Sequence, residues 1–209
     1  GNLWFAEVNG NKIGKLTPSK VKPGTSDGIV EYELPHANSK PQYLIVSRDD
    51  IVWFSEMGGN RIGRLDPATG IIREYDIPTP NSEPHHLFES RDRKIWFTEF
   101  EANKIGRLDP IMGEIKEFPV NEGHPHDLVV EDEYVWYTQG GKFWAQVFAN
   151  KIGYLELKTG KVGEIMIPPK KSVPHGMFLA SDGTIWFTQF FAGKISRLDF
   201  SEDFPPKVV

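Results

Sequence analysis

Apolar and polar residues alternate over short segments of this chain, and one such pattern recurs five times. It is clearest in residues 95–109, where Ile95–Glu99 is rich in β-branched and aromatic residues and Lys104–Leu108 alternates polar with apolar. Alternation with a period of two over about five residues, bounded by turn residues, is typical of β-strands. The pattern therefore predicts two short strands joined by a tight turn.

Each full unit predicts four strands. In the third unit the first strand begins at Pro84, the second is Ile95–Glu99, the third is Lys104–Leu108 and the fourth is Glu114–Phe118. The loop before the fourth strand has proline early and glycine late, which favours a hairpin turn. A proline-bearing link then leads into the next unit, as an outer strand leads into the next inner strand in a β-propeller.

The tryptophan of the second strand sets the period. It recurs at intervals of 49, 43, 40 and 50 residues, as Trp4, Trp53, Trp96, Trp136 and Trp186. A period in the low forties with four short strands is typical of a propeller blade. We therefore predict an all-β fold, a β-propeller of four-stranded antiparallel blades with tryptophan rings packed between the sheets. We expect one domain over residues 1–209, with units at approximately 1–35, 36–78, 79–119, 120–168 and 169–209.

The two ends of the repeat pattern leave the blade number open. The chain starts in the second strand of its first unit and finishes within the fourth strand of its last unit. Two interpretations follow: either five units close with an imperfect seam, or the chain is part of a longer propeller of six or seven blades.

Composition narrows the functional classes. The net charge is −5, and Lys and Arg are spread along the repeats, so no basic surface for nucleic acid is predicted. No apolar run reaches the roughly 18–20 residues of a membrane span, and no membrane partner is expected. The absence of cysteine excludes disulfides and thiolate chemistry. Cytoplasmic localisation is slightly favoured on this basis, and secretion stays open.

Histidines gather at one repeat position, the residue after the proline that opens each inner strand. That position holds Gln42, His85, His126 and His175, although the chain has only 6 histidines. Equivalent positions of a propeller form a ring around its axis, and histidine is a common general base and metal ligand. The alternative is a structural consensus in which each imidazole hydrogen-bonds neighbouring backbone.

Carboxylates accompany this ring. Glu83 stands two residues before His85, and Glu56 and Glu99 end their second strands where later units have Gln139 and Gln189. Carboxylate oxygens with imidazole suit a hard divalent ion such as Mg2+, which can stabilise a developing enolate or alkoxide.

An insertion marks the fourth unit. The segment from Gly140 to Gln146 lengthens the second hairpin and carries two large aromatic residues, Phe143 and Trp144. Such rings in a loop either pack over a neighbouring loop or line a ligand cleft.

The motifs together resemble one known family. Trp96–Glu99, Asn103–Pro110, Glu74–Pro78 and Pro84–His86 look like the repeat of virginiamycin B lyase propellers, and the similarity spans all five units. The resemblance implies a seven-bladed, Mg2+-dependent lyase that opens the ester of a cyclic depsipeptide by elimination, without adding water. In that family a histidine removes an α-proton while the metal polarises the ester carbonyl.

The resemblance also assigns residues. The family's Glu-Pro-His element matches Glu83-Pro84-His85, which makes His85 the base and Glu83 a metal ligand, and its second glutamate matches Glu99 or Glu101. The family's remaining metal histidine has Gln42 in its place. In the next frame His126 is the base, but His124 and Gln139 replace the glutamates. In the third frame His126 pairs with His175, but Val173 and Gln189 replace them.

Two functional classes remain. The first is a metal-dependent lyase, or related lactone hydrolase, acting on a small ester or lactone. Its predicted residues are His85 and His126 for catalysis, Glu83, Glu99, His126 and His175 for Mg2+, and Gln42, His86, Phe143 and Trp144 for substrate. The alternative is a non-catalytic propeller scaffold that binds a ligand or a protein partner. Blades missing from this chain would equally explain why each frame lacks a ligand.

Overall fold

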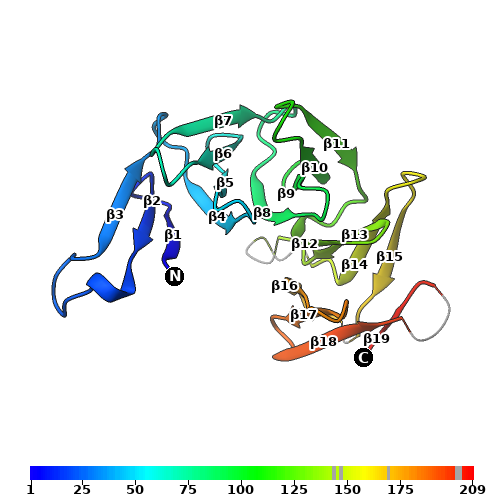
Figure 1. Ribbon diagram of the computed structural model, residues 1–209. Coiled ribbons are helices and arrows are strands. Elements are labelled where there is room, and N and C mark those ends of the chain that lie inside the picture. Colours follow the sequence, from blue (N-terminus) through cyan, green and yellow to red (C-terminus); the bar gives the residue numbers. More distant parts are fainter. Residues whose placement is uncertain (143–144, 146–147, 169, 201–203) are drawn as a thin grey trace. The chain divides into compact units, whose positions relative to one another are not determined.

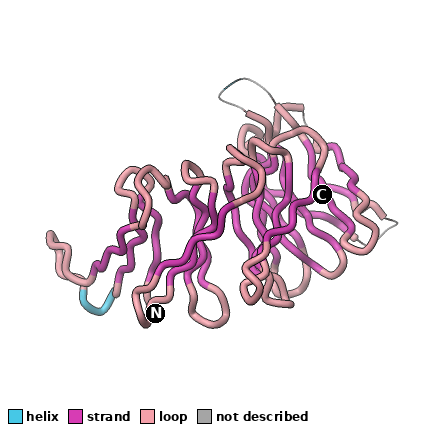
Figure 2. Tube along the Cα trace, turned by 90° about the horizontal axis from the view of Figure 1, so that it is seen from above, coloured by secondary structure: helices cyan, strands magenta, loops and turns pink. Residues whose placement is uncertain are grey.

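Antiparallel strands make up almost all of the regular structure of this protein. The computed structural model describes residues 1–142, 145, 148–168, 170–200 and 204–209. The strands form five sheets, coloured in chain order in Figure 1, and one short 3-10 turn is the helical segment drawn in Figure 2. No helix in the described ranges is long and apolar enough to span a membrane.

The first two sheets lie in a compact unit comprising Gly1–Leu87. Sheet 1 has three strands, β1 (Leu3–Glu7), β2 (Lys12–Leu16) and β3 (Ile29–Glu33), with the 3-10 turn η1 (Pro18–Lys20) between the last two. Sheet 2 has four, β4 (Pro41–Val46), β5 (Val52–Glu56), β6 (Arg61–Leu65) and β7 (Ile72–Asp76). Sheet 1, which is the first repeat, therefore begins with the strand that corresponds to the second strand of a full repeat, as predicted.

The other three sheets belong to a second unit comprising Phe88–Val209, and the division falls inside β8. Sheet 3 has β8 (Pro84–Glu89), β9 (Ile95–Glu99), β10 (Lys104–Leu108) and β11 (Ile115–Pro119). Sheet 4 has β12 (Pro125–Glu131), β13 (Tyr134–Gln139), β14 (Lys151–Glu156) and β15 (Val162–Met166). Sheet 5 has β16 (Pro174–Leu179), β17 (Ile185–Gln189), β18 (Lys194–Asp199) and β19 (Lys207–Val208). The prediction of a single domain stays a prediction.

The cores lie between successive sheets within each unit. One face of sheet 4 places Val129, Trp136 and Ile152 against Met177 and Phe187 of sheet 5. Sheets 3 and 4 pack in the same way, as do sheets 1 and 2. The tryptophan face of one sheet therefore meets the phenylalanine or tyrosine face of the next, and the predicted packing role of Trp53, Trp96 and Trp136 is confirmed.

The glycine of the recurring Lys/Arg-Ile-Gly sequence makes room for an aromatic ring. A Cβ added to Gly63 would lie 2.0 Å from the Phe54 ring, and one added to Gly106 would lie 2.1 Å from Phe97. These residues face each other across the second and third strands. The motif is therefore a packing unit, because any larger residue collides with the buried ring.

Candidate functional site

Three inner strands, β4, β12 and β16, begin with a break in the ladder at the position of the predicted ring. In β12 the pairing with β13 shifts between Pro125 and Leu128, and β4 and β16 shift between the equivalent residues. An irregularity of this kind bends the strand and redirects the side chains that it frees. The two residues after the proline, including the ring position, are thus set apart from the regular alternation.

A buried hydroxyl from the second strand fixes this break. Thr138 Oγ1 accepts the Asp127 N–H at 3.0 Å and donates to the His175 carbonyl of the following sheet at 2.7 Å. Ser55 and Thr98 donate likewise to the carbonyls of His85 and His126, at 2.7 and 2.8 Å. The Ser/Thr of the Trp-Phe-Ser/Thr-Glu sequence therefore holds the backbone of each ring histidine.

The asparagine of the Asn-Lys-Ile-Gly sequence anchors the link that precedes each inner strand. Asn103 Oδ1 accepts the N–H groups of Gly123 and His124 at 3.1 and 2.9 Å, just before Pro125. Asn60 binds the corresponding link, accepting the Ser82 N–H at 2.7 Å. Both asparagines have positive φ, which asparagine tolerates better than most residues. The hydroxyl of the second strand and the asparagine side chain together position the ring residue of each repeat.

His126 is enclosed by protein. Its side chain is 2% exposed, its Nε2 lies 3.2 Å from the Gly141 carbonyl, and its ring packs edge-on against Phe100 at 4.8 Å. The His175 ring lies 4.7 Å away, so the structure brings these two predicted residues together within the second unit. The contact with Gly141 joins an imidazole to a backbone carbonyl. It is the kind of contact expected if the recurring histidines have a structural role.

Asp127 is a site residue that sequence analysis missed. Burial raises the pKa of its carboxyl to about 6, although the Met177 N–H and the nearby His175 oppose the rise. Its Oδ2 accepts that N–H at 2.9 Å, which joins sheet 4 to sheet 5. A carboxyl with a pKa of about 6 near an imidazole, that of His175, suits proton transfer. The available signal was the acidic residue after Pro-His, which occurs in this unit alone.

His85 is more open than His126. It lies at the second position of β8, half-buried, with its ring 4.8 Å from Tyr43 and 52° from coplanar. His86 meets the other side of Tyr43 at 5.2 Å. The predicted base and the predicted substrate contact therefore share one tyrosine of the preceding sheet, in the first unit.

The predicted metal ligands divide between the two units. Glu83 belongs to the first unit, together with the predicted base His85, and Glu99, His126 and His175 belong to the second. Glu99 is fully buried at the end of β9, opposite Lys104, whose ammonium binds Glu117 at 2.9 Å. Within the described ranges, no group of three or more His, Asp or Glu side chains converges on one point. The oxygen donors suit Mg2+, but neither unit by itself gathers a full ligand set.

The remaining predicted contacts have separate surroundings. Gln42 is half-buried at the second position of β4. Phe143 and Trp144 lie outside the residues that the structure describes. Lys142, beside them, forms an ion pair with Glu101. These substrate assignments stay predictions.

Sequence analysis also missed that Glu99 belongs to a repeated polar row. A carboxylate or amide ends the second strand, a cation begins the third, and a glutamate follows on the fourth. The ion pairs are Lys12–Glu31 at 2.7 Å, Lys104–Glu117 at 2.9 Å and Lys151–Glu164 at 2.8 Å. The period itself contained this signal, because each third strand begins with Lys or Arg.

The chain resembles virginiamycin B lyase from Staphylococcus aureus over its full length, with 30% identity and a TM-score of 0.83. A catalytically inactive histidine-to-alanine variant of that enzyme with quinupristin is 32% identical, and a streptogramin B lyase is 31% identical, both with TM-scores of 0.83. The fold class is therefore an all-β propeller, as predicted.

The Virginiamycin B lyase family model matches residues 1–198. This chain belongs to that family, and the resemblance inferred from the motifs is confirmed. The chain spans 65 or 66% of the length of the three lyases described above. No curated protein matches it.

Proposed function

We propose that this chain carries part of a lyase that opens a cyclic ester or lactone by elimination, with His85 as the base. The observation that carries the proposal is the Glu83-Pro84-His85 sequence, which leads into β8 in a member of a lyase family. Ser55 holds the backbone of His85 while its ring stays partly open to solvent. A fixed backbone with an accessible imidazole suits a general base better than the enclosed His126 does.

The proposed step conserves all atoms of the substrate. The imidazole of His85 takes a proton from the carbon next to a carbonyl, and the released electron pair forms a carbon–carbon double bond. The ester C–O bond breaks, and its electrons stay on the leaving carboxylate. The substrate class is a cyclic depsipeptide of the quinupristin kind, which is bound by the related enzyme. Gln42, His86, Phe143 and Trp144 are the proposed substrate contacts.

Mg2+ is the proposed cofactor, with Glu83 and Glu99 as oxygen ligands and His126 and His175 as further candidates. When bound, such an ion supplies electrostatic stabilisation of negative charge that develops on a carbonyl oxygen. The proposal rests on the donor chemistry and the family. A metal bound by the folded form alone must raise the unfolding temperature in a saturable way, and Glu83→Ala must remove the shift.

The mass of the product tests the proposed activity, because it distinguishes elimination from hydrolysis. Elimination gives an open product with the mass of the cyclic substrate, whereas hydrolysis adds one water molecule. We expect the full chain with Mg2+ to give the isomeric product, and His85→Ala to lower the rate by about 100-fold or more. His36→Ala, which removes a histidine outside the ring position, is the matched control and should retain activity. Equal rates for His85→Ala and the parent chain would refute the assignment.

A non-catalytic binding scaffold is the second candidate. Gln42 stands where the lyase pattern calls for a metal histidine, and His126 is buried against Phe100 and Gly141. This reading predicts ligand binding that needs no metal and gives no product. Saturable binding of the cyclic depsipeptide in the presence of a chelator, with no open product, would favour it.

A further inference from the structure

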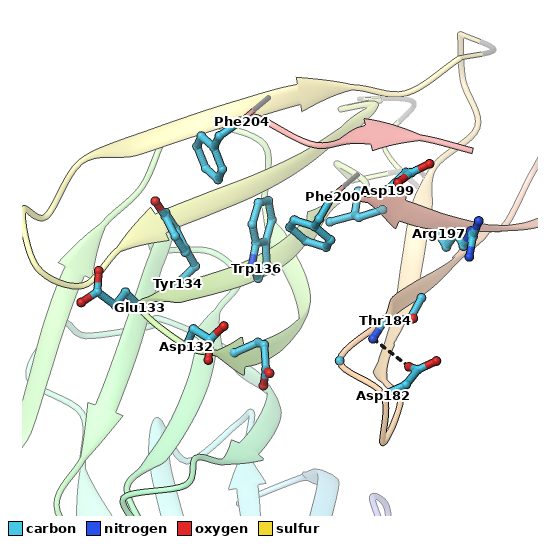
Figure 3. A pocket seen from close by; sticks show the side chains of 13 residues that line it. Asp132, Glu133, Tyr134, Trp136, Asp182, Thr184, Arg197, Asp199, Phe200 and Phe204 are labelled. Atoms are coloured by element: carbon cyan, nitrogen blue, oxygen red, sulfur yellow. Dashed lines mark hydrogen bonds between the residues drawn. The ribbon is translucent and has the colours of Figure 1, made fainter. Parts of the chain in front are cut away.

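A cavity of about 630 Å3 lies between sheets 4 and 5, away from the ring histidines (Figure 3). Its walls come from the β12–β13 turn, the β16–β17 hairpin and the end of β18. Tyr134 and Trp136, at the start of β13, line it, whereas the opposite end of that strand pairs with Pro125 beside His126. The volume falls in the usual range for small-molecule sites.

One wall of the cavity is aromatic. Tyr134 stacks on Phe204 at 5.0 Å, and Trp136 lies 5.4 Å from Phe200. Tyr154 does not line the cavity, but its ring supports the wall by meeting Phe204 at 5.0 Å. Figure 3 shows Phe204, Tyr134, Trp136 and Phe200 gathered together. Phe200 and Phe204 are exposed, although large apolar side chains usually avoid water. Such rings offer electron-rich faces that attract cations.

The rest of the lining is acidic. The cavity carries one guanidinium, that of Arg197, against five carboxylates: Glu131, Asp132, Glu133, Asp182 and Asp199. Arg91, outside the cavity, lies 2.9 Å from Glu131 and 3.7 Å from Asp132, so two of these carboxylates share one cation. The Thr184 N–H donates to Asp182, which holds the pKa of that carboxyl below its usual range. The field inside the cavity therefore favours a positive guest.

Sheet 4 also differs from its neighbours in the residue across from its tryptophan. In the first three sheets this residue is a cation over the ring, with Lys15 at 5.6 Å, Arg64 at 5.9 Å and Arg107 at 5.5 Å from the ring centroids. In sheet 4 the position holds Tyr154, and the cations found over rings in the described ranges include none over Trp136. In sheet 4 a tyrosine therefore stands where sheets 1 to 3 have a lysine or arginine.

We propose that this cavity binds an organic cation of the alkylated ammonium class. The aromatic side chains that line the cavity, Tyr134, Trp136, Phe200 and Phe204, would contact its alkyl groups, and the carboxylates would balance its charge. The guest would supply the positive charge that a lysine or arginine of the chain brings to the tryptophan in sheets 1 to 3. The proposal is independent of the lyase function, because none of these residues belongs to the predicted ring.

The test compares two molecules of the same shape. Choline and its neutral carbon isostere 3,3-dimethylbutan-1-ol differ in the charged nitrogen, so their dissociation constants report recognition of charge. We expect calorimetric titration of the full chain to give a dissociation constant at least about fivefold lower for choline, and the difference to shrink at high salt. Equal affinity for the two, or no choline binding up to about 50 mM, would overturn the proposal.

Variants locate the site. Tyr154→Arg restores the arrangement of sheets 2 and 3, and Gly163, opposite Tyr154, leaves room for the new side chain. Its guanidinium should occupy the cavity and weaken choline binding at least about tenfold. Choline binding unchanged by Tyr154→Arg would place the guest elsewhere and refute the assignment.

Two further changes separate charge from folding. The double variant Asp132→Asn with Glu133→Gln keeps the size of both side chains, and we expect it to weaken choline at least about threefold while leaving the isostere unchanged. Glu114→Gln, an exposed change of the same kind outside the cavity, is its control and should bind choline like the parent chain. Phe204→Ala removes an exposed ring and should also weaken choline. Full choline binding by both the double variant and Phe204→Ala would contradict the proposal.

Discussion

Glu56 ends the second strand of sheet 2 with its carboxyl fully buried. Burial raises the pKa of this group to about 7, while a hydrogen bond from Ser39 and the charge of Arg61 oppose the rise and the charge of Glu74 adds to it. Arg61 Nε lies 3.2 Å from Glu56 and 3.8 Å from Glu74, so one cation serves two acids. Sheets 4 and 5 have glutamine at the equivalent position, namely Gln139 and Gln189.

The raised pKa predicts that the stability of the chain falls as the pH rises, and that a glutamine in place of Glu56 removes this dependence. Between about pH 4.5 and pH 7 the folded chain keeps a proton on Glu56 that the unfolded chain has lost, so stability falls as pH rises and then levels off. We expect Glu56→Gln to raise the free energy of unfolding at pH 8 by about 1–3 kcal/mol and to have little effect at pH 4. Denaturant titrations at both pH values, with Glu114→Gln as the surface control, measure this difference. A pH-independent effect of Glu56→Gln would contradict the raised pKa.

At the scale of elements, one hydroxyl joins each inner-strand break to the next sheet. Thr138 shows both contacts, accepting from Asp127 and donating to His175. The same oxygen, Thr138 Oγ1, makes both bonds, and the side chain is fully buried. Ser55 in sheet 2 makes the same pair of contacts, accepting the Tyr43 N–H at 3.1 Å and donating to the His85 carbonyl at 2.7 Å.

Removing this hydroxyl without changing its size should destabilise the second unit. Thr138→Val leaves a buried N–H and a buried carbonyl without their partner, and we expect a loss of about 1–3 kcal/mol in unfolding free energy. Thr159→Val, in the exposed turn between β14 and β15, is the matched control and should lose less. Urea denaturation followed by tryptophan fluorescence reports both. Stability of Thr138→Val equal to that of the parent chain would show that the bridge contributes nothing.

At the scale of the whole molecule, sheet 5 presents a core face to solvent. Ile195 is 72% exposed, although its counterparts Ile13, Ile62, Ile105 and Ile152 are fully buried. On the same face Trp186 is 39% exposed, against 2% for Trp136. Where two successive sheets belong to the same compact unit, the tryptophan face of the first packs against the phenylalanine or tyrosine face of the second. This face therefore has the composition of a protein interior, although its isoleucine and its tryptophan are exposed.

We therefore expect copies of this chain to associate through the Trp186 face in solution. Light scattering coupled to gel filtration should show a mean mass that rises with concentration, because burying the exposed apolar area is favourable. Ile195→Lys should suppress the rise. Ile111→Lys, at an isoleucine that is 89% exposed in the β10–β11 turn, should leave it unchanged. A parent chain that stays monomeric over a wide concentration range would contradict this expectation.

The repeat, the strand order within each sheet and the packing of Trp53, Trp96 and Trp136 were readable from the sequence, whereas the exposure of Trp186 was not. These features depend on local alternation and on a period that five copies repeat, so neighbouring residues suffice to reveal them. The motif that marks the family was readable for the same reason. The positions of Pro125 and His126 were predicted, but the break that sets them apart from the ladder was not.

Only the tertiary structure decided how open each candidate residue is and what faces it. His85 and His126 occupy the same place in the repeat, yet Phe100 and the Gly141 carbonyl enclose His126 alone. The raised pKa of Asp127 and the aromatic cavity beside Tyr154 arise from residues that lie far apart in the chain. Burial and charge depend on the residues that meet in space, and a repeat gives equivalent positions without giving them equivalent neighbours.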